Sequence, residues 1–366
     1  MASFGKAAKK SKPKRKDVRV VDLFCGIGGL SHGLVLEGLN VVAGVDNDRS
    51  CKFAFEKNND AVFIGKNIAR FTAKELKKLY RGATTRVLVG CAPCQPYSAL
   101  NKKRLVKKDA REHWYPLFRF MRLIRKVKPE IVSMENVPDL SNEKRYPVFS
   151  DFLRTLKDCG YSVTFKIVDS SHYGVPQRRK RLVLLASRLG PIDLVPETHD
   201  EDELVTVRDA IAGLPRLKDG SRNTKDPLHR ASKLSPLNKK RIAATPKNGG
   251  SAKSWNRKLL LKCYRKKTGR SYMCTVYGRM KWDEPSPTMT TQCTVLGTGR
   301  FGHPSQNRAI SLREAALLQS FPADYEFVGP DKLIVHKVSQ HIGNAVPVLL
   351  GRSIGASLKK HLIEYA

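Results

Sequence analysis

The sequence predicts an α/β protein, in which one domain is a doubly wound, mostly parallel β-sheet and a smaller domain is irregular but contains strands. Three observations predict this class. From residue 17 to residue 188, short apolar runs alternate with helical stretches, as in sheets covered by helices on both faces. After Ser187 the alternation stops, and the chain becomes rich in Lys, Arg, Gly, Pro and Asn. Near the C-terminus, a last helical pattern has an apolar face that needs a surface to cover it.

The expected elements follow one another in a regular order. Strands are expected at residues 18–24, 41–46, 61–64, 86–90, 131–134, 162–168 and 181–186. Their nearly continuous apolar character is typical of parallel strands that are buried on both faces. Helices are expected between them at residues 29–37, 49–57, 72–80, 116–126 and 147–158. The last helix, 346–363, is expected to pack on the same domain, because a lone helix is not stable in water.

The chain is expected to divide into a tail and two domains. Residues 1–16 contain seven Lys and Arg and no acidic residue, which is typical of a disordered, solvated tail. Residues 17–188 and 335–366 are expected to form the larger domain. Residues 189–334 are expected to form the smaller domain together with a hinge.

The net charge limits the class of partner. The 366 residues include 68 Lys and Arg but only 33 Asp and Glu, a net charge of +35. Such a surface attracts polyanions, of which nucleic acid is the commonest. The chain has no run of 18 apolar residues and no apolar segment after its basic N-terminus, so we expect neither a membrane span nor a signal peptide. Eight cysteines are too few for a disulfide scaffold and favour a reducing, cytosolic setting.

A glycine-rich loop, Gly26 to Gly29, follows the first expected strand and opens the first helix. Glycines there allow a tight turn and a close approach of a cofactor to the helix N-terminus. Asp46 ends the second strand, 20 residues after Gly26 (46 − 26), where a carboxylate can bind ribose hydroxyls. A plain tight turn would explain the loop alone. With Asp46, the pattern favours a nucleoside cofactor, either a dinucleotide or S-adenosylmethionine.

A pair of cysteines, Cys91 and Cys94, follows the fourth expected strand. A zinc site is disfavoured because no second Cys or His pair completes four ligands, and no metal site is expected. Two interpretations stay open at this point. The pair could be redox-active, or one cysteine could be a nucleophile while the other packs.

Two further groups lie beside expected strands. Glu135, in the segment Met134-Glu135-Asn136-Val137, ends the fifth strand, where side chains of a parallel sheet point into a ligand crevice. The basic segment 177–181 opens the seventh strand. Alone, Glu135 could be a solvated strand-end acid, and the basic segment could be surface.

Together these motifs resemble the DNA (cytosine-5) methyltransferase family, of the bacterial and phage restriction–modification type. The glycine loop, the ribose acid, Pro-Cys, Glu-Asn-Val and Gln-Arg-Arg-Lys-Arg occur in the order of the family. Segments 313–322 and 343–347 resemble its last two motifs. The resemblance covers about residues 19–362, apart from a variable middle region.

The resemblance implies a catalytic set. Cys94 is expected to add as a thiolate to carbon-6 of cytosine, which makes carbon-5 reactive. Glu135 is expected to contact ring nitrogen 3 and the exocyclic amine, and Arg179 the carbonyl oxygen at carbon-2. Arg181 is expected to support them. Cys91 is expected to be replaceable by Ser or Ala without loss of methyl transfer.

The resemblance also implies S-adenosyl-L-methionine as methyl donor and a flipped cytosine in double-stranded DNA as substrate. Sequence recognition is expected within residues 189–285. Where relatives place an acid near the adenine amine, this chain has Asn67, whose side-chain carbonyl can accept the same hydrogen bond. The expected cofactor residues are Phe24, Gly26, Gly28, Gly29, Asp46, Asn47, Asn67, Ile68, Pro93, Asn344 and Val346. The expected DNA contacts are Gln95, Ser98, Lys102, Lys103, Arg104 and Thr288.

Three other functions fit the sequence less well. A tRNA cytosine-5 methyltransferase would have a Cys-Phe-Thr segment, which Gln292-Cys293-Thr294 does not match. A catalytically inactive DNA-binding regulator has no chemical reason to keep Cys94, Glu135 and Arg179. A nicotinamide-dependent oxidoreductase leaves the net charge unexplained. We expect a monomer that acts with a cognate restriction endonuclease in the bacterial or phage-infected cytoplasm, at the nucleoid, or in the nucleus if the source is eukaryotic.

Overall fold

The structure is a computed structural model that describes residues 17–93, 110–265, 275–329 and 333–366. Its centre is a seven-stranded sheet in the order β3-β2-β1-β4-β5-β7-β6. Strands β1 to β5 pair in parallel, and β7 is antiparallel to both of its neighbours. The strands are β1 (Val18–Leu23), β2 (Asn40–Asp46), β3 (Val62–Gly65), β4 (Thr85–Gly90), β5 (Ile131–Asn136), β6 (Ser162–Asp169) and β7 (Lys180–Ser187).

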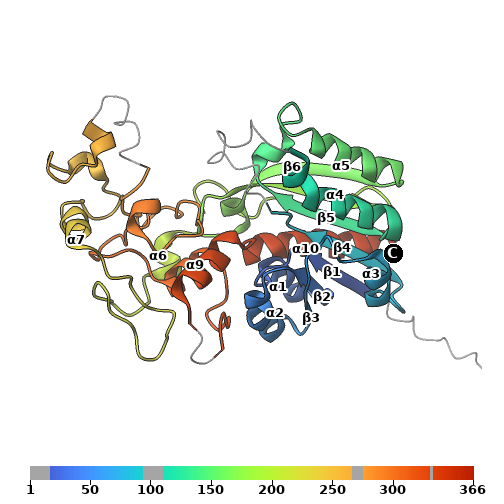
Figure 1. The fold of residues 1–366 in the computed structure, drawn as a ribbon, viewed down its shortest axis with the longest axis horizontal. Helices are drawn as coiled ribbons and strands as arrows, with labels where there is room; N and C mark the ends of the chain where they lie inside the picture. Colours follow the sequence, from blue (N-terminus) through green and yellow to red (C-terminus); the bar gives the residue numbers. More distant parts are fainter. Residues whose placement is uncertain (1–16, 94–109, 266–274, 330–332) are drawn as a thin grey trace, which may run out of the picture.

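Helices cover both faces of this sheet, as Figure 1 shows. Successive residues of a strand point to opposite faces, so Val20 and Val21 belong to two different buried clusters. One face carries α1 (Gly29–Leu36), α2 (Lys52–Asn59) and the C-terminal α10 (Val348–Tyr365). The other carries α3 (Ala73–Leu79), α4 (Ala110–Val127) and α5 (Pro147–Asp158). The prediction of a doubly wound, mostly parallel sheet is confirmed. None of the described helices is long and apolar enough to cross a membrane.

All seven expected strands are present, but two element boundaries matter for the site. Strand β5 continues to Asn136, so Glu135 lies inside the strand rather than after it. Helix α4 begins at Ala110 rather than at Pro116, which lies within the helix. Proline suits the first turn of a helix, and this preference misplaced the expected start. The expected last helix is α10, and α9 (Val335–Asn344) precedes it.

Segments beyond both expected boundaries of the larger domain contact the sheet domain. Beyond residue 188, the chain still lies on the sheet domain, where the Val195 N–H donates to Ser357 Oγ at 2.9 Å. Before residue 335, Phe321 and Tyr325 belong to the same buried cluster as Ile27, and the Tyr325 hydroxyl donates to the Ile27 carbonyl. The same buried cluster also contains Met280, Phe301 and Ile310 of the smaller domain, so the two domains share one apolar core at this point.

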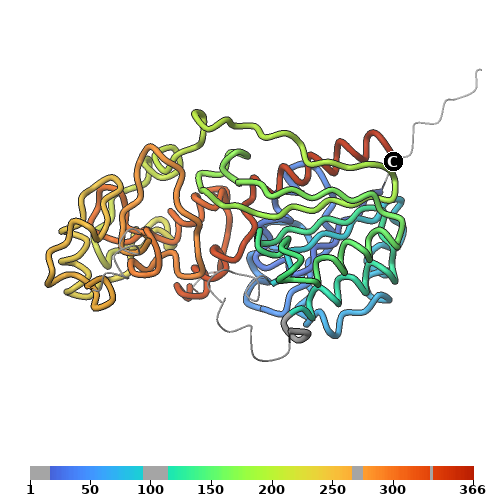
Figure 2. The backbone as a smooth tube through the Cα atoms, turned by 90° about the horizontal axis from the view of Figure 1, so that it is seen from above, coloured from blue at the N-terminus to red at the C-terminus, as the bar shows by residue number. Residues whose placement is uncertain are grey.

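The smaller domain is irregular, as the tube in Figure 2 shows for most of residues 200–310. Its described part contains α6 (Val207–Ile211), α7 (Pro236–Ala243) and short 3-10 turns, and α8 (Leu312–Leu318) follows it. We expected strands there, but its described residues form only isolated β-bridges, such as Arg279 with Gly302. Two of its buried apolar clusters are small, whereas Met280, Phe301 and Ile310 belong to the large cluster that also covers the sheet.

Arg279 is a buried charged residue of this domain. It is 1% exposed, and its guanidinium donates to the carbonyls of Ile242, Thr245, His303 and Gln306 at 2.6–3.0 Å. The carbonyls of Ile242 and Thr245 lie at the C-terminal end of α7, where the helix dipole favours a cation. Burial lowers the pKa of Arg279 to about 10.

Candidate active site

A cavity of about 460 Å³ lies at the carboxyl ends of the parallel strands. The order of the strands reverses between β1 and β4, and ligands of such sheets bind at this switch point. The segments that follow β1, β2, β3 and β4 line the cavity, and the end of α9 closes it. Of the expected cofactor residues, those that line it are Phe24, Gly26, Asp46, Asn47, Asn67, Ile68, Pro93, Asn344 and Val346.

Gly28 and Gly29 are not among the lining residues. A Cβ on Gly29 would lie 2.3 Å from the Val346 carbonyl, and one on Gly28 would lie 2.5 Å from Asn59 Nδ2. Gly28 also has a φ of +88°, which favours glycine. These two glycines therefore let α1 approach its neighbours closely, whereas we expected them to contact the cofactor.

Asp46 connects the loops after β1 and β2. Its Oδ2 accepts from the Gly26 N–H at 2.9 Å, and its Oδ1 accepts from the Asp48 N–H at 2.9 Å. Burial raises the pKa of Asp46. Each carboxylate oxygen keeps a second lone pair for a ligand hydroxyl. Asn67 Oδ1 similarly accepts from the Ala69 N–H at 2.8 Å, which fixes the side chain at the rim of the cavity.

Asp22 is a cavity residue to which we assigned no role from the sequence. It is 1% exposed, and Ser31 Oγ donates to its Oδ2 at 2.7 Å. Its Oδ1 is buried and accepts no hydrogen bond from any described residue. Burial raises the pKa of Asp22 to about 7. Its place at the end of β1, directly before the loop, was a signal that could have been used.

A mixed cluster lies on the same wall of the cavity. The ligand atoms of Asp48, Cys51 and His341 lie within 4.8 Å of one another, a donor set that suits a transition metal. However, Asp48 Oδ2 already lies 3.1 Å from His341 Nε2 and 3.8 Å from Lys337 Nζ. The ammonium group of Lys337 opposes a cation at this position.

Glu135 is buried beside the cavity, with 2% of its surface exposed. Cys91 Sγ donates to its Oε2 at 2.7 Å, and Arg181 Nε lies 2.9 Å from its Oε1. In the antiparallel pair of β5 and β7, Glu135 lies opposite Val183. Arg181 is two residues before Val183, so it is the diagonal neighbour of Glu135 on the same face of the sheet. Within the described chain, Oε1 accepts no hydrogen bond.

Arg179 directly precedes β7 and contacts main-chain carbonyls. It is 3% exposed, and its guanidinium donates to the carbonyls of Met289, Gly343 and Ala345 at 3.0–3.2 Å. These contacts connect the residue before β7 with Met289 and with the end of α9. The structure therefore places Arg181 against Glu135, and the roles toward the base that we expected of Arg179 and Arg181 stay predictions.

Comparisons with known proteins agree with this geometry. The family model for C-5 cytosine-specific DNA methylases matches residues 18–360. The chain belongs to this family. The type II methylase M.HgiDII of Herpetosiphon aurantiacus is 48% identical over 343 residues, which cover 94% of this chain and 95% of the relative. The type II methyltransferase M.Sau96I of Staphylococcus aureus is 30% identical, over 96% of this chain and 78% of its own.

Solved structures have the same fold as this methyltransferase. A DNA modification methyltransferase encoded within an E. coli prophage has a TM-score of 0.72 and 20% identity, over 94% of this chain and 99% of its own. The Dnmt2 methyltransferase of S. pombe has a TM-score of 0.62 and 18% identity, over 94% and 99%. The predicted C-5 cytosine DNA methyltransferase of restriction–modification type is thereby confirmed.

The expected DNA contacts of the methyltransferase are mostly untested. Thr288 is exposed, and its Oγ1 donates to the Arg178 carbonyl at 2.7 Å. The remaining expected residues lie outside the described part of the chain, and they are the nucleophile Cys94 and the DNA contacts Gln95, Ser98, Lys102, Lys103 and Arg104.

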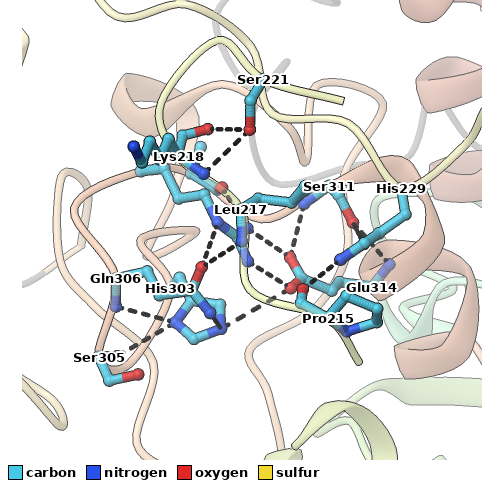
Figure 3. Close-up of polar contacts among 12 residues, drawn as sticks. Pro215, Leu217, Lys218, Ser221, His229, His303, Ser305, Gln306, Ser311 and Glu314 are labelled. Carbon is cyan, nitrogen blue, oxygen red and sulfur yellow. Dashed lines mark hydrogen bonds and ion pairs between the residues drawn. The ribbon is translucent and has the colours of Figure 1, made fainter. Parts of the chain in front are cut away.

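A buried polar network, drawn in Figure 3, joins the smaller domain of the methyltransferase to α8. Glu314 accepts two hydrogen bonds from Arg308 and one from the Ser311 N–H, all at 2.7 Å. Ser311 Oγ accepts in turn from the Glu314 N–H and contacts His229 Nδ1 at 3.0 Å. His303 Nε2 lies 3.7 Å from Glu314 Oε1. The segment 313–322 resembled a family motif, and this network gives Glu314 a structural role within it.

Proposed function

We propose that this methyltransferase transfers a methyl group from S-adenosylmethionine to carbon-5 of a cytosine that is flipped out of duplex DNA. One observation carries the proposal: the buried carboxylate of Glu135 is held by Cys91 Sγ at 2.7 Å and by Arg181 Nε at 2.9 Å, and Cys91 lines the cavity at the switch point. A carboxylate oxygen has two lone pairs, so each oxygen of Glu135 can still accept a hydrogen bond from a ligand donor. The amine of a flipped cytosine is such a donor.

The cavity fits S-adenosylmethionine by its chemistry. Asp46 offers carboxylate oxygens to ribose hydroxyls, as in other nucleoside sites at the end of a second strand. The free Oδ1 of Asp22 suits a positively charged ligand, since a carboxylate in a buried setting gains most from a cation. When bound, S-adenosylmethionine supplies an electrophilic methyl group on a sulfonium. Phe24 and Ile68 offer apolar surface for an adenine ring.

Each step of the proposed reaction is assigned to a residue of the chain. We assign the nucleophile to Cys94, whose thiolate adds to carbon-6 and sends the ring electrons to carbon-5. Carbon-5 takes the methyl group, a base removes its proton, and the thiolate leaves. Glu135 holds the exocyclic amine and ring nitrogen 3 while negative charge develops on the ring. Arg181, rather than Arg179, is positioned to reach the carbonyl oxygen at carbon-2.

The similarity to type II methylases supports a role in a restriction–modification system. We infer that a cognate endonuclease cuts the same short sequence, and that the methyltransferase acts as a monomer in the cytoplasm. The net charge of +35 supports contacts to many DNA phosphates. The smaller domain, with its Arg- and Lys-rich loops, is then the region that reads the sequence.

Bisulfite sequencing tests the proposal directly. Plasmid DNA is taken from a host that lacks cytosine methylation and expresses the methyltransferase, with Cys94→Ala as control. We expect protected cytosines in one short sequence context, and none in the control. Arg181→Lys and Arg179→Lys are compared by their methyl-transfer rates at saturating cofactor. A larger loss of rate for Arg179→Lys would contradict the assignment of Arg181 to the base.

A further inference from the structure

The thiol of Cys91 occupies a defined position in the site that the established reaction does not explain. Cys91 follows β4, and Glu135 lies on the neighbouring strand β5. The parallel register pairs Val89 with Ser133 and Gly90 with Met134. One more residue along each strand places Cys91 beside Glu135, with both side chains on the same face of the sheet. The fold therefore brings the thiol and the carboxylate together.

This contact fixes one of the two carboxylate oxygens. Cys91 Sγ donates to Oε2 at 2.7 Å, while Oε1 faces Arg181 and accepts no hydrogen bond from the described residues. Rotation of a carboxylate about its last torsion is broad in the absence of such partners. The thiol at Oε2 and the guanidinium of Arg181 at Oε1 together hold the carboxylate plane, and each oxygen keeps a second lone pair for a ligand.

Cys91 also lines the cofactor cavity, together with Ala92 and Pro93. It is partly exposed, whereas Glu135 is buried. The thiol therefore lies between the proposed position of the methyl donor and the group proposed to hold the base. A shift of Glu135 would move the base relative to the methyl group, and reaction rates are sensitive to such displacements.

We propose that Cys91 is a positioning residue for methyl transfer, which acts through its hydrogen bond to Glu135. The proposal rests on the function proposed above for Glu135. The thiol donates a hydrogen bond and transfers no proton, and it forms no covalent bond. This differs from our expectation from the sequence, that Cys91 can be replaced by Ala without effect.

Two substitutions separate the hydrogen bond from the space that the side chain fills. Cys91→Ala removes the donor, and Cys91→Ser keeps a donor of smaller size. We expect Cys91→Ala to lower the single-turnover rate of methyl transfer by about tenfold, because the orientation of Glu135 is lost. We expect Cys91→Ser to recover most of that rate. The half-saturating concentration of S-adenosylmethionine should stay within about twofold of the wild-type value for both variants.

Control variants test whether a loss of rate comes from unfolding or from weaker cofactor binding. Cys159→Ala removes another partly buried thiol, at the end of α5, and should leave the rate unchanged. If Cys91→Ala unfolds below the assay temperature, Cys91→Val fills the space without a donor and should show the same loss of rate. All variants are compared by their unfolding midpoints and by their affinity for S-adenosylmethionine.

The outcomes distinguish the two proposals. If the wild-type protein methylates DNA and Cys91→Ala keeps its full rate, the role of Cys91 is refuted while the proposed function stands. The same holds if Cys91→Ser is as slow as Cys91→Ala. A rise in the half-saturating cofactor concentration at an unchanged rate would show that Cys91 only shapes the cavity. If the wild-type protein itself methylates no DNA, the proposed function fails first.

Discussion

Replacing Glu314 by Gln removes the negative charge that faces Arg308 at the junction of the two domains. Both side chains are buried, with 1% and 0% of their surfaces exposed. Burial raises the pKa of Glu314, but the hydrogen bonds and the charge of Arg308 outweigh burial and lower it below its usual value. The pair therefore stays ionised at neutral pH. A Gln at position 314 would leave a buried guanidinium without its counter-charge.

The expected loss of stability follows from this geometry. Breaking a buried, two-point ion pair by removing one partner costs about 3–5 kcal/mol. An entropy of unfolding near 2.1 cal/mol/K per residue gives roughly 0.8 kcal/mol/K for 366 residues that unfold together. Dividing the first quantity by the second predicts that the unfolding midpoint falls by roughly 4–6 °C.

Thermal unfolding of three variants measures this effect. Glu314→Gln is compared with the double variant Arg308→Met/Glu314→Leu, which removes both charges and should lie closer to the wild type. Glu284→Gln is the matched control, because Glu284 pairs with Lys281 on the surface, where an ion pair is worth about 0–1 kcal/mol. A midpoint for Glu314→Gln within 1 °C of the wild type would refute the reasoning. A double variant less stable than the single one would also refute it.

Three further predictions concern the pH dependence of stability, the pH dependence of cofactor binding, and the close packing at Gly29. Burial lowers the pKa of His303 to about 4, so the unfolded chain binds a proton near pH 6.5 that the folded protein does not. The free energy of unfolding, measured with urea, should fall by about 2 kcal/mol between pH 7 and pH 5, and His303→Asn should reduce that fall. The raised pKa of Asp22, about 7, predicts that affinity for S-adenosylmethionine in calorimetry rises by about tenfold from pH 6 to pH 8, as the carboxyl loses its proton. An equally steep rise in Asp22→Asn would contradict this. Gly29→Ala should lower the free energy of unfolding by about 1–3 kcal/mol and weaken cofactor binding, because its Cβ would meet the Val346 carbonyl. Gly213→Ala is the control, because its Cβ would meet nothing within 4 Å, and it should change neither quantity.

Much of the sheet domain could be predicted because its central strands, such as β1 and β5, are mostly apolar and buried. Strand ends of a parallel sheet meet at one edge, so motifs that follow β1, β2 and β4 had to converge. The spacing of 20 residues between Gly26 and Asp46 was enough to predict their closeness, and Asp46 Oδ2 accepts from the Gly26 N–H. The cofactor residues at these strand ends line one cavity for the same reason.

The contact between Arg181 and Glu135 could not be predicted in this way. It depends on the antiparallel register of β7 against β5, which no local pattern specifies. That register makes Arg181 the diagonal neighbour of Glu135. Arg179 precedes the strand, and its partners come from segments more than 100 residues away in the sequence. The packing of Gly29 against the distant Val346 carbonyl could not be predicted for a similar reason.

The contacts of Arg279 bear on how the smaller domain can change during evolution. Four of its acceptors are main-chain carbonyls, which every amino acid carries. Substitutions at positions 242, 245, 303 and 306 therefore preserve these acceptors as long as the backbone path is kept. The loops that surround Arg279 can therefore change their side chains at these four positions while one guanidinium keeps the same main-chain partners.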